Sequence, residues 1–414
     1  MSKLFLADAS EQVSYTYKEL IEDLNSGPHE LSCFFLGKKT YDVFRAYLLV
    51  LLCEIDITLL DADFSAEEID ALIPDADERA RKLSCRVEPP IQGVADLLER
   101  VRRVGEGRIG FFTSGTTGLP KRVSHQIATL ARSVKHSSRH AESVWAFAYN
   151  PTHIAGCQVF MQAVMNGNAI VNVFGLDRKG IYNALQDYGV TNISATPTFY
   201  RMLMPADQSV GSVSRVTFGG ERMDPKLVEH LERAFPSAKF LNVYASTEAG
   251  TILAAEGEVF SIKEGLEDLV RISDDQLMVH RSLLGEFGDT THTPVDDWYA
   301  TGDVVSIISE NPLRFKILHR SNELINVGGY KVNPAEVEAV LRAMDGVREV
   351  RVFGKKNSIL GNLVCCDVVL GNPDLTEKAI RQHLASNLQA FKVPRLINFV
   401  GAIETTRTGK LKRS

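Results

Sequence analysis

The chain has 414 residues, enough for two or three domains with cores of their own. Its apolar content of 44% is typical of a globular protein, its net charge of −6 argues against nucleic acid as a partner, and its six cysteines without a CxxC pair argue against a disulfide framework or a zinc site. The N-terminus has no signal peptide and no apolar run approaches the roughly 18 residues of a membrane span, so we expect a cytoplasmic protein without a membrane span.

Helix and strand patterns alternate along most of the chain, which predicts an α/β fold. Residues 101–113 lead a short apolar strand into a loop rich in glycine, serine and threonine. Further along, four apolar residues from Ile181 to Tyr188 recur at helical spacing, Gly189 ends the helix, and residues 190–194 continue as a strand.

A domain boundary is indicated near residues 320–333. Asn333 has the position of a helix N-cap, Pro334 that of the first helical residue, and Glu336 completes a capping-box pattern. The elements expected after this helix are two strands at 347–354 and 363–370, a helix from about residue 376, and a last stretch at 392–400. Cys365 and Cys366 lie in the second strand, where we expect them to pack in the core.

Residues 111–121 read FFTSGTTGLPK, a loop whose composition suits an anion. The Walker A pattern cannot be aligned with it, because Lys121 follows Pro120 and precedes Arg122. Its glycines nevertheless let backbone N–H groups approach phosphate oxygens, its hydroxyls add donors, and Lys121 adds a positive charge. A surface turn is the alternative, since Gly, Ser and Thr are also common turn residues.

Five motifs, in order, resemble the signatures of the adenylate-forming superfamily, which comprises acyl- and aryl-CoA synthetases, adenylation domains of peptide synthetases and firefly-type luciferases. The phosphate loop of the superfamily is matched by TSGTTGLPK, its Tyr-Gly-x-Thr-Glu motif by NVYASTEAG, with Ala245 in place of Gly, and its Thr-Gly-Asp motif by YATGDVV. Its hinge stretch is matched by LHRSNELINVGGYKVNPAEVE, with His319 in place of Gly, and its Gly-Lys motif by TRTGKLKR. A weaker match is FGGERM, and together the motifs span nearly the whole chain.

This resemblance implies a large α/β N-terminal domain of several subdomains, at residues 1–320, and a small mobile α+β C-terminal domain that carries a catalytic lysine, at residues 321–414. It also implies that a small carboxylic acid is joined to the α-phosphate of ATP with loss of pyrophosphate, so ATP and Mg²⁺ are the expected cofactors. The implied ATP-binding residues are Thr113, Ser114, Gly115, Thr116, Thr117, Gly118 and Lys121 for the phosphates, Gly219, Gly220, Glu221 and Tyr244 for the adenine, and Asp303 and Arg320 for the ribose.

The resemblance further implies three catalytic residues. Lys410 would bridge the carboxylate and the α-phosphate, Thr247 would contact the α-phosphate, and Glu248 would bind Mg²⁺, which prefers oxygen ligands in the company of phosphates. Taken singly, Tyr244 also fits a core position, Asp303 a turn and Lys410 a solvated tail. Their common order along the chain is what supports the assignment.

The implied acid pocket is lined by His153, Gly156, Ala245 and Ser246. The alternative for His153 is a core histidine satisfied by the backbone. Amino-acid-activating relatives place an Asp in this segment, and none occurs between Trp145 and Gly167, so an α-amino acid with its unpaired ammonium is disfavoured. The extra methyl of Ala245 predicts an aromatic or short-to-medium acid in preference to a long fatty acid.

In CoA ligases of the superfamily the small domain rotates after adenylation, and a thiol then attacks the acyl-adenylate. The hinge position aligns with Asn322, and the adjoining Gly328 and Gly329 would let a pantetheine arm pass close to the backbone. The chain is shorter than is usual for the superfamily, both before the phosphate loop and between Glu248 and Asp303.

The leading hypothesis is therefore an ATP- and Mg²⁺-dependent acid–thiol ligase that passes its acyl group to CoA or to the phosphopantetheine of a carrier protein. A second hypothesis is an adenylation-only enzyme, or one with a non-thiol acceptor, and an amino-acid- or fatty-acid-activating enzyme is a further variant of it. A third is a catalytically silent binding relative, which the retention of Lys121, Glu248, Asp303 and Lys410 argues against.

Overall fold

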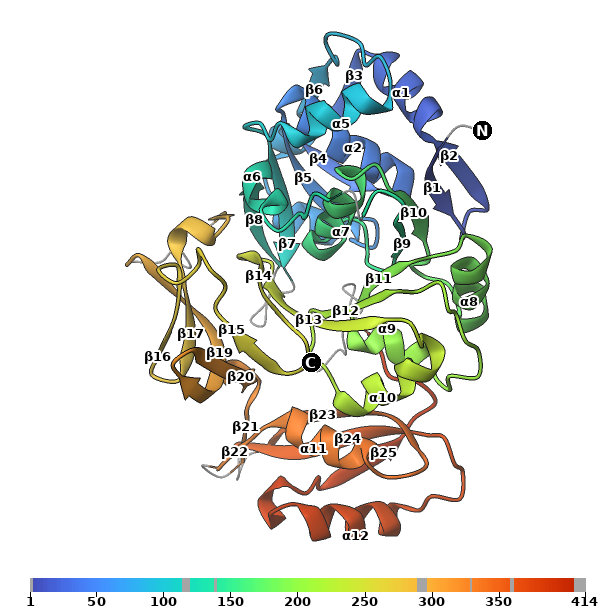
Figure 1. Cartoon of the computed structure of the whole chain (residues 1–414). Helices are drawn as coiled ribbons and strands as arrows, with labels where there is room; N and C mark the ends of the chain where they lie inside the picture. The colour runs from blue at the N-terminus through green and yellow to red at the C-terminus, as the bar shows by residue number, and fades with distance from the viewer. Residues whose placement is uncertain are drawn as a thin grey trace. The chain divides into compact units, whose positions relative to one another are not determined.

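The computed structural model describes residues 3–113, 120–137, 140–288, 296–327, 330–357 and 361–405, with the side chains of residues 113, 322 and 361 left out. The chain forms two compact units, which are described separately (Figure 1). Unit 1 is Met1–Leu269 with Val279–Tyr299, and unit 2 is Val270–Met278 with Ala300–Ser414. The domain boundary expected at residue 320 stays a prediction.

Unit 1 is built on an eight-stranded sheet whose six inner strands are parallel. Its two edge strands pair antiparallel with their neighbours. In sheet order, the strands are β14 (Gly250–Ala255), β13 (Lys239–Ser246), β12 (Arg215–Gly219), β11 (Asn192–Ala195), β9 (Val144–Phe147), β10 (Ala169–Asn172), β1 (Leu4–Asp8) and β2 (Val13–Thr16).

A second sheet of unit 1 combines parallel strands with a hairpin. Its strands, in sheet order, are β18 (Glu286–Phe287), β8 (Lys121–Gln126), β7 (Arg108–Thr113), β5 (Asp56–Asp61) and β4 (Phe34–Gly37). The smaller strands of this unit are β3 (His29–Ser32), which pairs with β6 (Lys82–Cys85), and β15 (Val259–Ser261). The strand expected before the glycine-rich loop is β7, as the sequence predicted.

Helices of unit 1 connect and cover these strands (Figure 1). They are α1 (Tyr17–Asn25), α2 (Thr40–Cys53), α3 (Ala66–Leu72), α4 (Ala76–Ala80), α5 (Val94–Arg102), α6 (Ile127–Ala131), α7 (Ile154–Val164), α8 (Arg178–Asp187), α9 (Pro197–Met202), α10 (Pro225–Ala234) and the 3-10 turn η2 (Arg281–Leu283). Helix α8 confirms the helix predicted from residue spacing: Asp177 caps it by accepting from the Gly180 amide, and Gly189 follows it at φ +58°.

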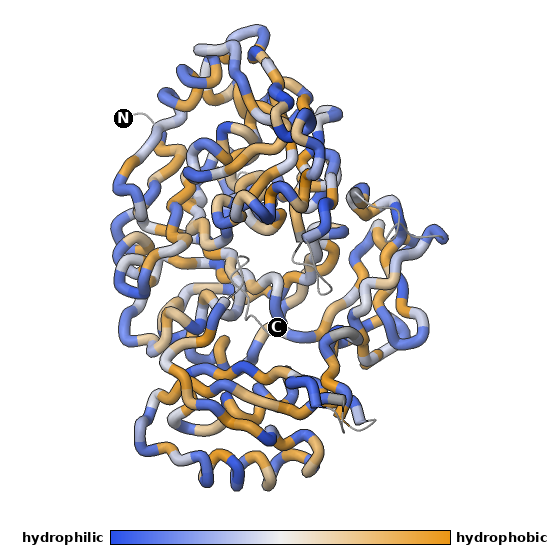
Figure 2. The backbone as a smooth tube through the Cα atoms, turned by 180° about the vertical axis from the view of Figure 1, so that it is seen from behind, coloured by the Kyte–Doolittle hydropathy of each residue, from blue (hydrophilic) through white to orange (hydrophobic). Residues whose placement is uncertain are grey.

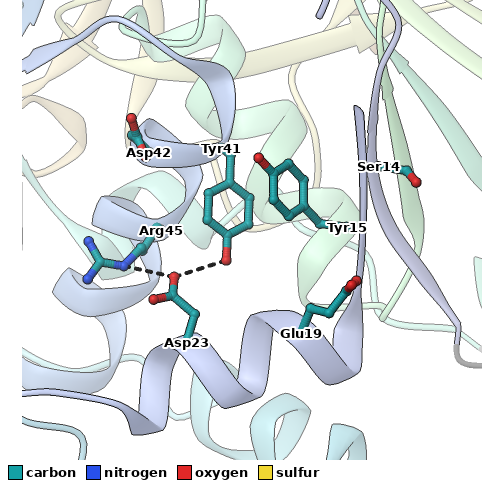
Figure 3. Close-up of a pocket in the computed structure, with 7 residues that line it drawn as sticks. All are labelled: Ser14, Tyr15, Glu19, Asp23, Tyr41, Asp42 and Arg45. Atoms are coloured by element: carbon teal, nitrogen blue, oxygen red, sulfur yellow. Dashed lines mark hydrogen bonds and ion pairs between the residues drawn. The ribbon is translucent and has the colours of Figure 1, made fainter. Parts of the chain in front are cut away.

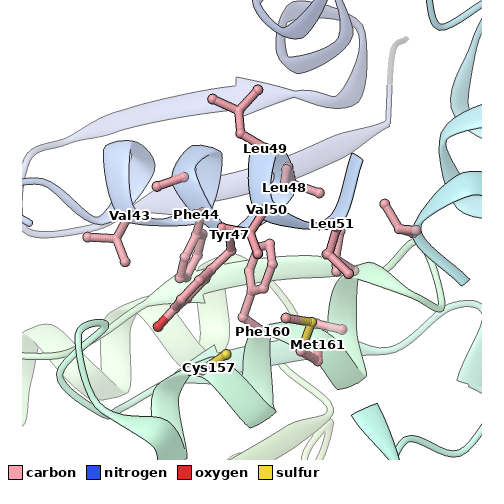
Figure 4. Close-up of a cluster of buried hydrophobic side chains, with 14 of the residues drawn as sticks. Val43, Phe44, Tyr47, Leu48, Leu49, Val50, Leu51, Cys157, Phe160 and Met161 are labelled. Atoms are coloured by element: carbon pink, nitrogen blue, oxygen red, sulfur yellow. The ribbon is translucent and has the colours of Figure 1, made fainter. Parts of the chain in front are cut away.

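The core of unit 1 is centred on α2, which is apolar on nearly all sides and therefore buried (Figure 4). Its Phe44 and Tyr47 meet Phe160 of α7, with ring centroids 4.6 and 5.2 Å apart. In the described part of the chain, no helix is both long and apolar enough to cross a bilayer.

The described residues of unit 2 form two sheets and two α-helices. The first sheet includes β16 (Val270–Ser273), β17 (Gln276–His280), β19 (Trp298–Glu310) and β20 (Leu313–Arg320). The second has β21 (Ile325–Val327), β22 (Tyr330–Val332), β23 (Val347–Asn357), β24 (Gly361–Leu370) and β25 (Leu396–Phe399). Its helices and 3-10 turns are α11 (Pro334–Arg342), α12 (Glu377–Asn387), η3 (Ser321–Glu323) and η4 (Ala390–Lys392). Figure 2 shows apolar and polar residues alternating along α12, which buries Ile380 and Leu384.

The elements predicted after residue 333 are confirmed, with one correction. Asn333 is the N-cap of α11 and Pro334 its first residue, but the Asn333 side chain accepts from the Ala335 amide, 3.0 Å away, so no capping box forms. The Glu336 carboxylate instead binds Nζ of Lys392 at 2.7 Å, because an ammonium is a stronger partner for it than a backbone amide. The two adjacent cysteines are buried in β24, as expected.

Candidate active site

The carboxyl ends of the parallel strands in unit 1 gather several of the predicted residues. Gly219 ends β12, and Tyr244 and Ser246 lie at the end of β13; Tyr149, which the sequence analysis did not single out, follows β9. Open parallel sheets bind their ligands outside this edge, since the loops that leave it converge there. This edge is therefore the candidate active site.

The phosphate loop is described at its two ends. Thr113 and Lys121 are partners across the β7–β8 hairpin, so the strands hold both ends of the loop in register. Lys121, the first residue of β8, is partly buried. The predicted residues Ser114, Gly115, Thr116, Thr117 and Gly118 lie outside the described part of the chain.

The turn predicted at the adenine favours glycine at two positions. A Cβ on Gly219 would lie 3.1 Å from the Tyr149 hydroxyl, and Gly220 has φ +80°, a conformation that favours glycine. The carboxylate of Glu221 accepts from the amide and hydroxyl of Thr198, at 2.9 and 2.7 Å, and so ties this turn to the start of α9. In the neighbouring strand β13, Tyr244 directly follows Val243, the cross-strand partner of Gly219. Tyr244 is buried, with 9% of its surface exposed.

The turn between β13 and β14 carries the predicted Thr247 and Glu248. The Thr247 carbonyl accepts from Nε2 of His125 at 2.7 Å, and the Glu248 carbonyl accepts from the Gly285 amide at 2.8 Å. His125 is fully buried on β8, and burial lowers the pKa of its ring to about 4. The ring is therefore neutral near pH 7 and carries its proton on Nε2, because a carbonyl can only accept.

Sequence reasoning did not single out His125. Its signal in the sequence is slight: it lies four residues after Lys121 in the strand pattern KRVSHQ. Only the sheet arrangement brings it to the Thr247 carbonyl, 122 residues further along the chain.

The ring of the predicted pocket residue His153 has a carboxylate as a partner, in contrast to a core histidine whose hydrogen bonds are all to the backbone. Its Nε2 lies 3.3 Å from Oδ2 of Asp61, a buried carboxylate at the end of β5 that also accepts from Nδ2 of Asn150 at 2.8 Å. The sequence argument against an acidic residue considered only positions 145–167, and it missed Asp61 because that residue reaches His153 from another strand, 92 residues away.

The other predicted pocket residues lie near this pair or near the Glu248 turn. A Cβ on Gly156 would lie 2.6 Å from the Asn150 carbonyl and 3.0 Å from the Phe147 ring, so α7 can approach β9 only with glycine there. Ala245 and Ser246 close β13, where the pairing with β14 shifts register, and the Ser246 hydroxyl accepts from the Ala249 amide at 3.2 Å.

Unit 2 contains the predicted ribose residues. Asp303 is buried, 4% exposed, and is the cross-strand partner of Arg320, whose Nε lies 3.1 Å from Oδ1 of Asp303. The Thr301 hydroxyl accepts from the Asp303 amide at 3.1 Å and donates to the Leu277 carbonyl at 2.9 Å, so Thr301 ties the part of β19 that carries the carboxylate to β17. The side chain of Asn322, Gly328, Gly329 and Lys410 lie outside the described part of the chain.

A cavity of about 480 Å³ lies elsewhere in unit 1 and contains none of the predicted residues (Figure 3). Tyr15 and Tyr41 stack in it with centroids 4.0 Å apart, and Asp23 accepts from the Tyr41 hydroxyl at 2.9 Å and pairs with Arg45 at 3.0 Å. Glu19 forms a capping box with Thr16 at the start of α1. These interactions account for the two carboxylates as structural groups.

Comparisons with known proteins identify the family of the chain. The family model described as AMP-binding enzyme matches residues 109–270, and the one described as AMP-binding enzyme C-terminal domain matches residues 336–410, together more than half of the chain. An acyl-CoA synthetase of Alternaria alternata is 26% identical over an alignment 381 positions long, which covers 75% of this chain and 64% of the length of that relative.

Solved structures show the same fold. The o-succinylbenzoate CoA synthetase of Bacillus subtilis, in complex with its acyl-adenylate intermediate, has a TM-score of 0.72 at 17% identity, with 99% of this chain and 94% of that one covered. The amide bond synthetase of Marinactinospora thermotolerans has a TM-score of 0.71 at 19% identity, with 100% and 96% covered. The predicted fold class, a large α/β N-terminal domain with a smaller C-terminal domain, is confirmed.

Proposed function

Because the chain belongs to the AMP-binding enzymes of the adenylate-forming superfamily, we propose that it activates a carboxylic acid with ATP and passes the acyl group to a thiol. One observation supports this most directly. The turn with Thr247 and Glu248, at the carboxyl edge of the main sheet, is joined through His125 to β8, the strand that begins with Lys121. This hydrogen bond therefore links the turn with Thr247 and Glu248, suited to the α-phosphate and Mg²⁺, to the strand with Lys121, suited to the departing phosphates.

In the first step, a carboxylate oxygen attacks the α-phosphorus of ATP, and the bond to pyrophosphate breaks. Lys121 would hold the departing phosphates, and Thr247 would donate its hydroxyl to the α-phosphate. The adenine would lie beside Tyr244 and the turn with Gly219 and Gly220; Gly219 lets the backbone of this turn lie close to the Tyr149 hydroxyl, which a Cβ would approach to 3.1 Å.

The described residues fit Mg²⁺ held largely by phosphates. Among them, no group of three or more His, Cys, Asp or Glu side chains could form a metal cage. Mg²⁺ in nucleotide sites is usually bound by one or two carboxylates, with phosphate oxygens and water as its other ligands, and Glu248 supplies one carboxylate. When bound, the ion would neutralise charge on the phosphates that leave as pyrophosphate.

For the acid, we propose an aromatic or short-to-medium chain. Asp61 already accepts hydrogen bonds from Asn150 at 2.8 Å and from the Asp63 amide at 3.1 Å, and its Oδ2 lies 3.3 Å from Nε2 of His153, so the carboxylate has hydrogen-bond partners without a substrate ammonium. Ala245, at the end of β13, would narrow the pocket by one methyl group relative to the glycine that is usual in the family. His153, held by Asp61, would orient the acid at the mouth of the pocket.

In the second step, a thiol sulfur attacks the acyl carbon, the bond to AMP breaks, and the thiol proton is released. We propose CoA or the phosphopantetheine of a carrier protein as the thiol. Lys410 would act in the first step, Asp303 and Arg320 would contact the ribose, and Asn322 would be the hinge.

A second candidate function is transfer to an amine. It is favoured by the likeness in fold to the amide bond synthetase of Marinactinospora thermotolerans. An amine nitrogen would attack the same acyl carbon and release AMP, so adenylation would be unchanged and only the acceptor would differ.

ATP–pyrophosphate exchange tests the proposal, with aromatic acids, short, medium and long fatty acids and an α-amino acid. Each active acid is then offered CoA, a phosphopantetheinylated carrier protein or an amine. Exchange and thioester formation with an aromatic or short-to-medium acid are expected. Exchange without a thioester would favour the adenylation-only or amine alternatives, and no exchange with any acid would favour the silent relative.

Glu248→Gln keeps the shape of the side chain and removes its charge. We expect it to slow exchange about 100-fold or more, because a metal ion supplies several kcal/mol of charge stabilisation. Glu256→Gln, an exposed change just after β14, is the matched control. Equal activity of the two variants would contradict the assignment of Glu248.

A further inference from the structure

The turn from Thr247 to Ala249 is held by groups from outside it. Each of its three carbonyls accepts a hydrogen bond from elsewhere in unit 1: Thr247 from His125, Glu248 from the Gly285 amide, and Ala249 from the Arg132 guanidinium. These hydrogen bonds to the carbonyls hold the backbone of the turn in one conformation. The backbone conformation in turn sets the direction of the Thr247 and Glu248 side chains.

His125 is the most constrained of these groups. Its ring is fully buried, and its cross-strand partner on β7 is Ile109. Its Nε2 donates to the Thr247 carbonyl at 2.7 Å, while Nδ1 has no hydrogen-bond partner among the described residues. A buried imidazole with an unpaired nitrogen costs stability, so packing alone does not account for a histidine at this position.

Gly285 fits the same arrangement from the other side. A Cβ on this residue would lie 2.7 Å from both Cε1 and Nε2 of His125, so only glycine allows the backbone to lie against the ring. In that position its amide reaches the Glu248 carbonyl at 2.8 Å. The next residue, Glu286, begins β18 and pairs with Ser124 of β8, which keeps the segment in place.

Arg132 completes the support. It follows α6 directly, and its guanidinium donates to the carbonyls of Leu283 at 3.0 Å and Thr251 at 3.4 Å, as well as to that of Ala249. It thereby joins the turn, the start of β14 and the segment that carries Gly285.

We infer that His125 is a positioning residue for Thr247 and Glu248, with Gly285 and Arg132 as its supports. This inference rests on the proposed function. Strand β8 then has two tasks: its first residue, Lys121, binds phosphate, and its fifth sets the turn that binds the metal and the α-phosphate. An extended strand rises about 3.3 Å per residue and is stiff, so the two groups keep a fixed separation.

The test is the Mg²⁺-dependent part of ATP affinity, that is, the factor by which Mg²⁺ tightens the binding of ATP. It is measured on the full chain by calorimetry with and without Mg²⁺. His125→Ala is expected to lower this part about 10-fold or more, the size usual for residues that orient metal ligands, and His125→Gln, whose amide can donate to the carbonyl, is expected to lose about 3-fold or less. Gly285→Ala keeps the histidine at position 125 but pushes its ring away from the Thr247 carbonyl. We therefore expect the same loss as in His125→Ala.

Gln126→Ala, an exposed change on the same strand, is the matched control, and the melting temperature of each variant is recorded. An unchanged Mg²⁺-dependent affinity in a folded His125→Ala protein would overturn the inference. So would equal losses of affinity with and without Mg²⁺, which would indicate a merely structural role. If the natural chain binds ATP with Mg²⁺ but exchanges no pyrophosphate, the proposed function fails and the test of His125 remains decisive. If the natural chain does not bind ATP, both the proposed function and the inference about His125 are overturned.

Discussion

At the scale of single residues, burial of His125 links the protein's stability to pH. Burial lowers the pKa of this ring from 6.5 to about 4, an effect larger than those of the neighbouring Arg132, which lowers it, and Glu248, which raises it. Between these two pH values the unfolded chain binds a proton that the folded chain does not. Lowering the pH from about 6.5 to 4 should therefore reduce the free energy of unfolding, by about 3 kcal/mol from this residue.

Urea unfolding at several pH values measures this effect. His125→Gln should show a shallower fall in stability over the same pH window. His230→Gln, at an exposed position of α10, is the control for the loss of a histidine in general. An identical slope in the natural chain and in His125→Gln would show that His125 does not contribute.

At the scale of elements, we expect the contact of α2 with α7 to contribute strongly to the free energy of unfolding of unit 1. Phe160 is fully buried between Phe44 and Tyr47 of the facing helix (Figure 4). Phe160→Ala should lower the free energy of unfolding by about 3–5 kcal/mol, through lost burial and the cavity that remains.

Chemical unfolding checks this prediction, with Met202→Ala as the control, because Met202 ends α9 with 45% of its surface exposed. Equal losses in the two variants would contradict the central place of the α2–α7 contact. His153 is the N-cap of α7, so the same packing also positions the residue proposed to orient the acid.

At the scale of the whole molecule, the proposed reaction divides into two steps. Lys410→Ala should slow adenylate formation about 100-fold or more, since it removes positive charge where charge develops in the transition state. Transfer from supplied acyl-adenylate to the thiol should be largely retained. Single-turnover assays of each step provide the measurement.

Lys412→Ala, two residues further along, is the matched control for Lys410→Ala. Equal loss of both steps in Lys410→Ala would contradict the rotation of the small domain between them. Loss in Lys412→Ala as well would indicate a general role of the basic tail.

The sequence by itself determined the family, the order of the motifs and several local elements. The helix at 178–187 and the start of α11 could be predicted because they depend on residue spacing and caps, which are properties of neighbouring residues. The capping box at Glu336 was wrong because its carboxylate finds Lys392, 56 residues away.

Only the tertiary structure decided which distant residues support the site. Asp61 reaches His153 across 92 residues, and His125 reaches Thr247 across 122, because in each pair a strand of the second sheet lies against a loop that leaves the eight-stranded sheet, whatever their separation in the chain. Neither pair has a spacing that a local pattern could reveal. The motifs thus predict the residues that would bind ATP, while the packing of strands and helices determines which side chains lie against them.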